Sequence, residues 1–258
     1  MEFISSPGYI YCSFGGKHES VPTKDNCDLR VYYAKTKELS SYYTELKKYI
    51  SHEEKIRAEK FHYEDDRETY VTCHALLRLI LAAYINTAPL EIRFETGINN
   101  KPGIQNNLIY FNIAHSRNEF AIAVCNNFHV GIDIESIHQD IDIFSVAKSF
   151  FSSKECDFIF KSDKADKDRF FLLWTQKEAL LKAIGTGLID NIKELDLSGQ
   201  DNIMNKSLFD NSFSDIASNG HYIDSMRISD FYLSLAIPIK ASVNLVHLIP
   251  DNITSYLL

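Results

Sequence analysis

The stretch Val130-Gly131-Ile132-Asp133-Ile134-Glu135 places two carboxylates two residues apart in an otherwise apolar, β-branched run. Side chains two residues apart in a β-strand lie on the same face, so Asp133 and Glu135 are expected to point the same way. Burying an unpaired carboxylate costs several kcal/mol. We therefore predict that a cation, a metal ion or a solvent-filled cleft faces this strand.

A second charged segment, Trp174-Thr175-Gln176-Lys177-Glu178-Ala179-Leu180-Leu181-Lys182, has the pattern of a helix. Glu178 and Lys182 are one turn apart and share a face. Glu178 thus adds a third carboxylate, and three oxygen donors suit Mg²⁺, which completes its shell with water and phosphate oxygens. Lys182 is expected to hold a further phosphate oxygen. A simple Glu178–Lys182 surface pair, worth a few tenths of a kcal/mol, is the alternative interpretation.

The composition is that of an ordinary globular protein. A chain of 258 residues with 45% hydrophobic residues and six prolines can bury a large core in one or two domains. A net charge of −8 disfavours a nucleic-acid partner. No apolar run reaches the length of a membrane span and no basic signal segment begins the chain, so we expect a cytoplasmic protein. The cysteines lack a Cys-x-x-Cys pair, which favours reduced thiols over disulfides or zinc at Cys12, Cys27, Cys73, Cys125 and Cys156.

The periodicity of apolar residues predicts mixed helices and strands in a repeated order. In the first half we expect strands at 8–12 and 29–33 around a polar stretch at 15–26, helices at 38–60 and 67–85, and a β-meander at 109–113, 119–125 and 129–135. In the second half we expect helices at 144–151 and 168–184 and strands at 226–228, 231–236 and 243–248. The segment 74–78 (HALLR) resembles 178–182 (EALLK), an echo that chance explains about as well as duplication.

Four segments in the same order resemble the signature of the 4′-phosphopantetheinyl transferases, in particular the larger single-chain type that activates peptide and polyketide synthetases. Two are the carboxylate strand and the helix from Trp174 to Lys182. The third, Asn100-Lys101-Pro102, is similar to a Gly-Lys-Pro motif. The fourth, Phe111-Asn112-Ile113-Ala114-His115-Ser116, is similar to Phe-Asn-Ile-Ser-His-Ser and has Ala114 where a serine is usual. The resemblance spans about residues 53 to 188.

This resemblance implies an α+β fold in which two similar α+β halves form a pseudo-dimer within one chain, with the active site in the cleft between them. The half at 1–129 would bind the 3′-phosphate and adenine of coenzyme A, and the half at 130–258 would bind metal and pyrophosphate. The implied reaction is Mg²⁺-dependent, with Mn²⁺ as a substitute. It transfers the 4′-phosphopantetheine of coenzyme A to a serine of an acyl or peptidyl carrier protein and releases 3′,5′-ADP. A monomer in secondary metabolite biosynthesis, serving nonribosomal peptide or polyketide pathways, is expected.

The resemblance also assigns roles to single residues. The metal-binding acids would be Asp133, Glu135 and Glu178. The coenzyme A contacts would be Arg57, Lys101, Pro102, His115, Ser116, Lys177 and Lys182, with Lys182 the better pyrophosphate ligand. The general base is left open between Glu178 and Glu155, and Lys182 completes the catalytic set. Glu54 and Glu68 depart from the pattern because basic residues are usual there.

Several of these assignments have simpler structural alternatives. Glu155 is equally explained as an acid in the first turn of a helix, Lys101 and Pro102 as a turn, His115 as a strand-end residue, and Arg57 as a solvated charge. Some of the apolar residues Phe144, Val146, Phe150 and Phe151 should pack in the core, whereas others would form an apolar patch for the carrier protein. Two other functions also fit the pattern: a non-catalytic coenzyme A or nucleotide-binding regulatory module, and metal-assisted pyrophosphate hydrolysis. The retained acids and lysines favour the transferase.

Overall fold

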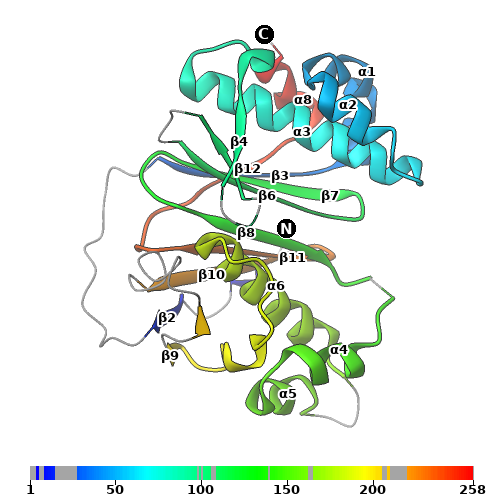
Figure 1. Ribbon diagram of the computed structural model, residues 1–258. Coiled ribbons are helices and arrows are strands. Elements are labelled where there is room, and N and C mark those ends of the chain that lie inside the picture. The colour runs from blue at the N-terminus through cyan, green and yellow to red at the C-terminus, as the bar shows by residue number, and fades with distance from the viewer. Residues whose placement is uncertain are drawn as a thin grey trace.

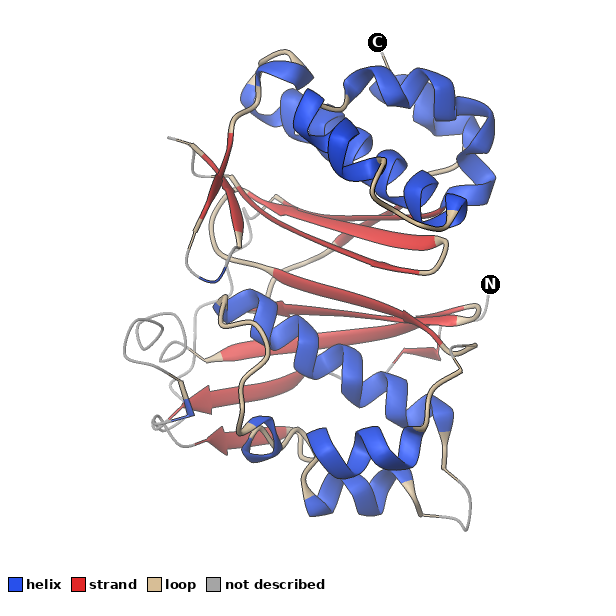
Figure 2. Cartoon of the chain, turned by 45° about the vertical axis from the view of Figure 1, so that its right-hand side comes forward, coloured by secondary structure: helices blue, strands red, loops and turns tan. Residues whose placement is uncertain are grey.

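The computed structural model describes residues 4–5, 9–14, 28–97, 99, 101–105, 109–138, 140–161, 165–204, 208–209 and 220–257. The predicted polar stretch at 15–26 and Cys27 lie outside them, as do Gly8 and Asn100. Four layers stack on one another in the order helices, sheet, sheet, helices (Figure 1). Figure 2 shows the strands in the two inner layers and the helices outside them. The predicted α+β class is confirmed.

The upper sheet has the strand order β12-β3-β7-β6, and its pairs are antiparallel except for the parallel pair β12 and β3. Its strands are β3 (Leu29–Lys35), β6 (Tyr110–Ser116), β7 (Glu119–Cys125) and β12 (Asn244–His247). A two-stranded hairpin, β4 (Phe94–Thr96) with β5 (Pro102–Ile104), lies beside it. Its outer face is covered by η1 (Thr36–Tyr42), α1 (Tyr43–Leu46), η2 (Lys47–Tyr49), α2 (His52–Ala58), α3 (Glu64–Ile85), η3 (Pro89–Glu91), α8 (Pro250–Ile253) and η8 (Thr254–Tyr256).

The lower sheet has the order β8-β11-β10-β2-β9, with β1 paired to β10. Its strands are β1 (Ile4–Ser5), β2 (Ile10–Phe14), β8 (Gly131–Ser136), β9 (Asp201–Met204), β10 (His221–Ile228) and β11 (Phe231–Ile237). Its outer face is covered by α4 (Ile143–Phe150), α5 (Ser153–Ile159), α6 (Lys167–Ile184) and η5 (Ile192–Glu194). No helix in the described ranges has both the length and the apolar character needed to cross a membrane.

The expected helix at 38–60 is broken into η1, α1, η2 and α2. The break lies at Ile50 and Ser51, both of which have extended backbone. Ser51 is the N-cap of α2, where its side chain accepts a hydrogen bond from the backbone N–H of Glu54 and the Glu54 carboxylate accepts one from the N–H of Ser51. This reciprocal capping box starts a new helix in a segment whose apolar spacing alone indicated continuity.

The two halves repeat one arrangement of strands and helices. Strands β3, β7 and β6 pair in that order under α3, and strands β8, β11 and β10 pair in the same order under α6. A short helix with a capping box precedes each long helix, from Ser51 and Glu54 in the first half and from Ser152 and Glu155 in the second. The repeated segments 74–78 and 178–182 lie in the corresponding long helices α3 and α6.

The ends of the chain cross between the halves. Strand β2, near the N-terminus, pairs with β10 of the lower sheet, and β12, near the C-terminus, pairs with β3 of the upper sheet. β12 is thus an outermost strand of the upper sheet, and β2 lies between β10 and β9 in the lower sheet. The division into 1–129 and 130–258 stays a proposal, in which these terminal strands are exchanged.

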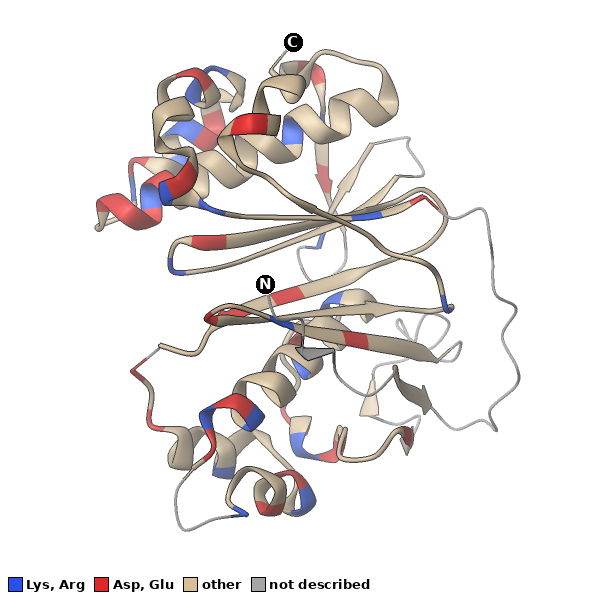
Figure 3. Ribbon diagram, turned by 180° about the vertical axis from the view of Figure 1, so that it is seen from behind, with Lys and Arg blue, Asp and Glu red and all other residues tan. Residues whose placement is uncertain are grey.

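The described residues form three clusters of buried side chains, one between each pair of neighbouring layers. The middle cluster joins the two sheets and contains Val31 and Ala123 from the upper sheet and Ile132 and Leu233 from the lower sheet. None of the four described cysteines forms a disulfide, and three of them, Cys12, Cys73 and Cys125, are buried. Charged residues of both signs gather mainly on the outer helices (Figure 3).

Strand β8 lies directly against α6, and Gly131 makes this contact possible. A Cβ atom at Gly131 would collide with the carbonyl oxygen of Ala179 and the backbone nitrogen of Ala183, both on α6. A glycine inside a strand commonly marks such a close backbone approach. The glycine that begins the acidic strand therefore fixes the separation between that strand and the helix carrying Glu178 and Lys182.

We predict that Gly131→Ala lowers the free energy of unfolding by about 3 kcal/mol, because backbone atoms on both sides of the clash must move. Gly103→Ala is the matched control, since its Cβ would lie 3.7 Å from Glu95 Cγ, an ordinary contact. Urea denaturation of both variants measures the difference. Equal stabilities of the two variants would contradict this account of the β8–α6 contact.

Candidate active site

The acidic strand faces a lysine of the neighbouring helix. Asp133 on β8 is 4% exposed, and its Oδ1 accepts a hydrogen bond of 2.6 Å from Lys182 Nζ on α6. The second carboxylate oxygen of Asp133, Oδ2, is buried and has no hydrogen-bond partner among the described residues. The cation predicted opposite this strand is therefore present, and one carboxylate oxygen remains available.

Lys182 lies among three carboxylates. Although burial lowers the pKa of its ammonium group, the negative charges of Asp133, Glu178 and Glu135 raise that pKa above the usual range of lysine. Burial, followed by repulsion from Asp133, raises the pKa of Glu178, which is half-buried. Burial also raises the pKa of Asp133, against the opposing effect of Lys182. Lys182 therefore stays charged and acts as the shared counter-ion of these acids.

Ser116 links the upper sheet to the acidic strand. Its Oγ donates a 2.6 Å hydrogen bond to Glu135 Oε2 and accepts one of 3.2 Å from the N–H of Ser136. On the same strand β6, Asn112 Oδ1 accepts a 2.8 Å hydrogen bond from the N–H of Ile132. The predicted site residue Ser116 thus orients Glu135 and holds β6 beside β8.

The three predicted metal ligands are only partly gathered. In the part of the chain that the structure describes, no three His, Cys, Asp or Glu side chains form a cluster that could hold a metal ion. Asp133 and Glu178 are close enough to repel each other, and Asp133 Oδ2 is an unsatisfied buried oxygen. Carboxylate oxygens of this kind are the donors that Mg²⁺ prefers. Asp133 and Glu178 therefore fit a magnesium ion, whereas Glu135 is held by Ser116.

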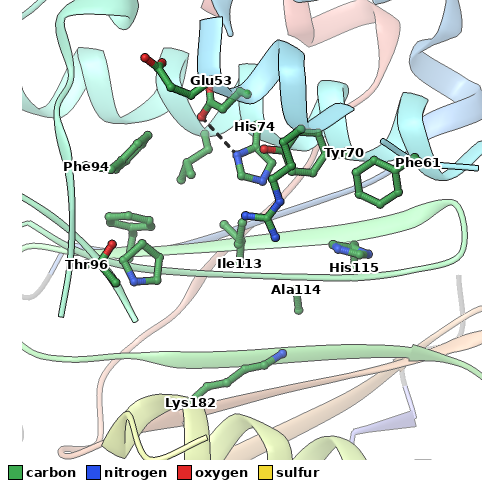
Figure 4. Close-up of a pocket in the computed structure, with 15 residues that line it drawn as sticks. Glu53, Phe61, Tyr70, His74, Phe94, Thr96, Ile113, Ala114, His115 and Lys182 are labelled. Carbon is green, nitrogen blue, oxygen red and sulfur yellow. Dashed lines mark hydrogen bonds and ion pairs between the residues drawn. The ribbon is translucent and has the colours of Figure 1, made fainter. Parts of the chain in front are cut away.

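A cavity of about 820 Å³ lies between the first-half helices and β6. Figure 4 shows Tyr70 and His74 on one side, Ile113, Ala114 and His115 on β6, and Lys182 reaching toward it from α6. The full lining is Glu53, Glu54, Arg57, Phe61, Tyr70, His74, Leu77, Phe94, Thr96, Pro102, Phe111, Ile113, Ala114, His115 and Lys182. The structure thus brings Arg57, Pro102, His115 and Lys182 together, as the sequence predicts.

Four basic groups, Arg57, His74, His115 and Lys182, are among the described residues that line this cavity. Partial burial lowers the pKa of His115, and the charges of His74, Lys182 and Arg57 lower it further. The Arg57 guanidinium is exposed and lies 5.6 Å from the centre of the Tyr70 ring, a cation–π distance. A solvent-accessible cavity with basic groups at its wall can bind an anionic ligand such as a phosphate ester.

Glu54 also lines the cavity, but its charge is already compensated. Its Oε2 accepts a 2.7 Å hydrogen bond from Arg78 Nε, and its Oε1 lies 3.3 Å from His74 Nδ1. Although burial alone would raise the pKa of Glu54, these partners lower it to about 2. Sequence reasoning treated Glu54 only as a departure from the family pattern, although the Ser-x-x-Glu spacing of a capping box was a visible signal. Arg78 and His74 were not predicted as site residues.

Lys101 is occupied by backbone groups. Its ammonium donates hydrogen bonds to the carbonyl oxygens of Val130, Lys182 and Ala183, at 3.2, 2.5 and 3.0 Å. Burial lowers the pKa of Lys101 to about 8. It is not among the described residues that line the cavity, whereas its neighbour Pro102 is. The predicted coenzyme contact at Lys101 therefore has no support in this geometry.

Glu155 and Lys177 form a separate buried ion pair of 2.8 Å, with exposed side-chain fractions of 0% and 1%. The Glu155 carboxylate also accepts hydrogen bonds from the N–H groups of Ser152 and Leu197. Lys177 Nζ donates to the carbonyl oxygens of Phe150 and Ile192. Neither side chain lines the described cavity. These contacts match the alternative reading of Glu155 as a first-turn helix acid, and they leave Glu178 as the general-base candidate near Lys182.

We predict that Glu155→Gln lowers the free energy of unfolding by about 3–5 kcal/mol, because it leaves the buried Lys177 charge without its counter-ion. Combining Glu155→Gln with Lys177→Met should recover part of this loss, since no unpaired charge then remains. Chemical denaturation of the wild type, the single variants and the double variant measures the coupling. Additive losses would show that the two residues do not act as a pair.

Two family models match consecutive parts of the chain. Residues 37–127 match the model described as "4'-phosphopantetheinyl transferase, N-terminal". Residues 129–228 match the model described as "4'-phosphopantetheinyl transferase superfamily". Together these matches include most of the chain and both sides of the cavity.

Curated relatives bear the same family name. The chain is 31% identical over 154 residues to 4'-phosphopantetheinyl transferase HetI of Nostoc sp.. The aligned region covers 58% of this chain and 65% of HetI. The chain is 31% identical over 142 residues to 4'-phosphopantetheinyl transferase Sfp of Bacillus subtilis, covering 54% of this chain and 62% of Sfp. It is 28% identical over 160 residues to the human L-aminoadipate-semialdehyde dehydrogenase-phosphopantetheinyl transferase, covering 57% and 52%. The chain thus matches somewhat less than two thirds of the length of these relatives.

Proposed function

The chain belongs to the 4'-phosphopantetheinyl transferase superfamily, and we propose that it transfers the 4′-phosphopantetheine group of coenzyme A to a serine hydroxyl of an acyl or peptidyl carrier protein. The reaction is proposed to need Mg²⁺, with Mn²⁺ as a substitute, and to release 3′,5′-ADP. One observation carries this proposal. Lys182 joins the acidic pair Asp133 and Glu178 to a basic-walled cavity large enough for a nucleotide.

Coenzyme A is proposed to lie along this cavity with its phosphates near the basic groups. Arg57 and His115 would contact the 3′-phosphate end, because both line the first-half wall. Pro102 would contact the adenine. Lys182 would bind a pyrophosphate oxygen, since its ammonium lies between the cavity and Asp133. Ser116 would act through Glu135, to which it donates a hydrogen bond.

Magnesium fits the acidic end of this arrangement. Asp133 and Glu178 would hold the ion, with Glu135 as the third predicted ligand if it exchanges its hydrogen bond from Ser116. When bound, the ion supplies positive charge that offsets the charge developing on the pyrophosphate. In the structure, Lys182 bonds to Asp133 Oδ1, and Oδ2 is the buried oxygen without a hydrogen-bond partner among the described residues.

The chemistry needs one proton acceptor. The serine oxygen attacks the β-phosphorus, the bond from that phosphorus to the bridging oxygen breaks, and 3′,5′-ADP leaves with the electron pair. Glu178 is proposed to take the serine proton, because its carboxylate is half-buried and lies near both Asp133 and Lys182, the residue that borders the cavity.

The carrier protein is proposed to dock near α4 and α5. Phe144 on α4 is 63% exposed and Phe158 on α5 is 41% exposed, whereas Phe151 is buried at 2%. Of the residues predicted from the sequence, Phe151 is thus buried in the core and Phe144 is exposed, and Phe158, which was not predicted, is exposed beside it on α5. An apolar contact is needed because the net charge of −8 would repel an acidic carrier. We further propose a monomer that acts in peptide or polyketide pathways, since two similar halves already form the cleft.

We predict that the protein, incubated with coenzyme A, Mg²⁺ and an apo carrier protein, adds one phosphopantetheine per carrier, as measured by intact mass. Chelation of the metal should stop the reaction. Asp133→Asn keeps the side-chain shape but removes a charged oxygen donor, so transfer should fall at least about 100-fold. Asp251→Asn, on exposed α8, is the matched control and should keep the wild-type rate.

Other results of this assay would exclude the transferase. Coenzyme A bound without any change in carrier mass would favour a regulatory binding module. Hydrolysis of coenzyme A without carrier modification would favour pyrophosphate hydrolysis. Full transfer by Asp133→Asn in the presence of metal would contradict the assignment of Asp133.

We predict that Arg57→Ala weakens binding of coenzyme A about tenfold or more but changes binding of 3′-dephospho-coenzyme A only slightly, because the guanidinium pairs with the 3′-phosphate. Isothermal titration with both ligands measures the two affinities. Lys60→Ala, an exposed neighbour that is not among the described lining residues, is the control. Equal losses for both ligands would place Arg57 away from the 3′-phosphate.

A further inference from the structure

The loop between β4 and β5 belongs to the first half but bonds to the end of α6 in the second half. Lys101 donates to the carbonyl oxygens of Lys182 and Ala183, in the last turn of α6. Asn99 Nδ2 donates a 2.8 Å hydrogen bond to the carbonyl oxygen of Thr186, just beyond the helix. Two side chains of one loop therefore hold the same helix terminus.

These contacts satisfy a specific need of the helix. The last four carbonyl groups of an α-helix lack partners within it, and the C-terminal end favours a positive charge. Gly185, at φ +92°, ends α6, and the N–H groups of Gly185 and Thr186 both bond to the carbonyl of Leu181. The carbonyls of Lys182 and Ala183 are the acceptors that Lys101 uses.

Lys101 also binds the start of the acidic strand. Its third hydrogen bond goes to the carbonyl oxygen of Val130, the residue before β8. The Lys101 ammonium therefore joins the end of α6 to the beginning of β8. The contact on α6 is at Lys182, which pairs with Asp133 on β8. Because Pro102 lines the cavity, the same loop also borders the coenzyme side.

We propose that Lys101 is a positioning residue, which sets Lys182 and Asp133 relative to the cavity by tying α6 to β8, and that it does not bind coenzyme A itself. This inference rests on the proposed transferase function. All three proton donors of an ammonium are accounted for by its three carbonyl partners. Asn99 supports the same attachment through Thr186, so the loop acts as a two-point clamp on the helix end.

The test compares binding with turnover in Lys101→Met. With Lys182 displaced, kcat should fall at least about tenfold, because misplacement of a catalytic group by about an ångström costs up to 100-fold. The Kd of coenzyme A should rise by no more than about threefold, although Lys182 is one of the proposed ligands, because Arg57 and His115 on the first-half wall are not held by Lys101. Amide hydrogen exchange at Gly185 and Thr186 should accelerate. Lys101→Arg, which keeps several donors, should recover most of kcat, and Lys47→Met, at an exposed lysine, should change none of these quantities.

A milder variant covers the case in which Lys101→Met does not fold. Asn99 has φ +52°, so Asn99→Gly removes the side chain without backbone strain and should lower kcat and speed the same amide exchange, each to a smaller extent.

A loss of coenzyme A affinity as large as the loss of kcat/KM, with unchanged amide exchange, would overturn the proposal and make Lys101 a direct ligand. Unchanged kcat in Lys101→Met would also overturn it. Absence of transfer by the wild type would instead refute the proposed function, because the exchange measurement does not depend on activity.

Discussion

A charged carboxylate that is buried needs a partner that offsets its lost hydration, and for Asp133 this partner is Lys182. The pair joins β8 of the inner sheet to α6 of the outer layer, at 2.6 Å. Holding it requires the strand and the helix to lie close together, which Gly131 permits and which Lys101 maintains at the helix end. It also requires the upper sheet to stay beside β8, where Asn112 bonds to Ile132. The site therefore depends on the contact between the halves.

Among the described residues, a buried carboxylate pairs with a lysine or arginine of a long helix in three places, with different outcomes. Glu54 with Arg78 and Glu155 with Lys177 each join a capping-box helix to a long helix, and both pairs are nearly closed to solvent. Asp133 with Lys182 differs, because the lysine side chain is 28% exposed and one carboxylate oxygen is unsatisfied. A closed ion pair stabilises or orients the fold only while both partners remain. An open one can exchange its counter-ion for a metal or a phosphate, which is what a catalytic site needs.

Local sequence patterns were enough to predict several features of the fold and of the site. The alternation around Asp133, the one-turn spacing of Glu178 and Lys182 and the four family-like segments predicted the acidic strand, the facing cation and the two-half α+β fold. Sequence reasoning did not separate Lys101 from the coenzyme ligands or Glu155 from the general bases. Their partners are backbone carbonyls and N–H groups, or side chains more than twenty residues away. Such contacts are set by the packing of the halves, and a motif match carries no information about them. The crossing of β2 and β12 was missed for the same reason.

Net charge also says little about the field inside the cavity. The chain has a net charge of −8, yet the negative charge of Glu54 in the cavity wall is offset by its ion pair with Arg78. Glu53, at the exposed edge of the cavity, remains negative. Hydrogen bonds from a backbone N–H group and from the Ser51 hydroxyl lower the pKa of its carboxyl group. The positive groups that face the cavity are Arg57 and Lys182, from opposite halves. An anionic ligand that contacts both would bridge the halves, and its two ends would then be held by the same cleft that orients Asp133 and Glu178. Lys182 therefore belongs both to the cavity wall and to the acidic site.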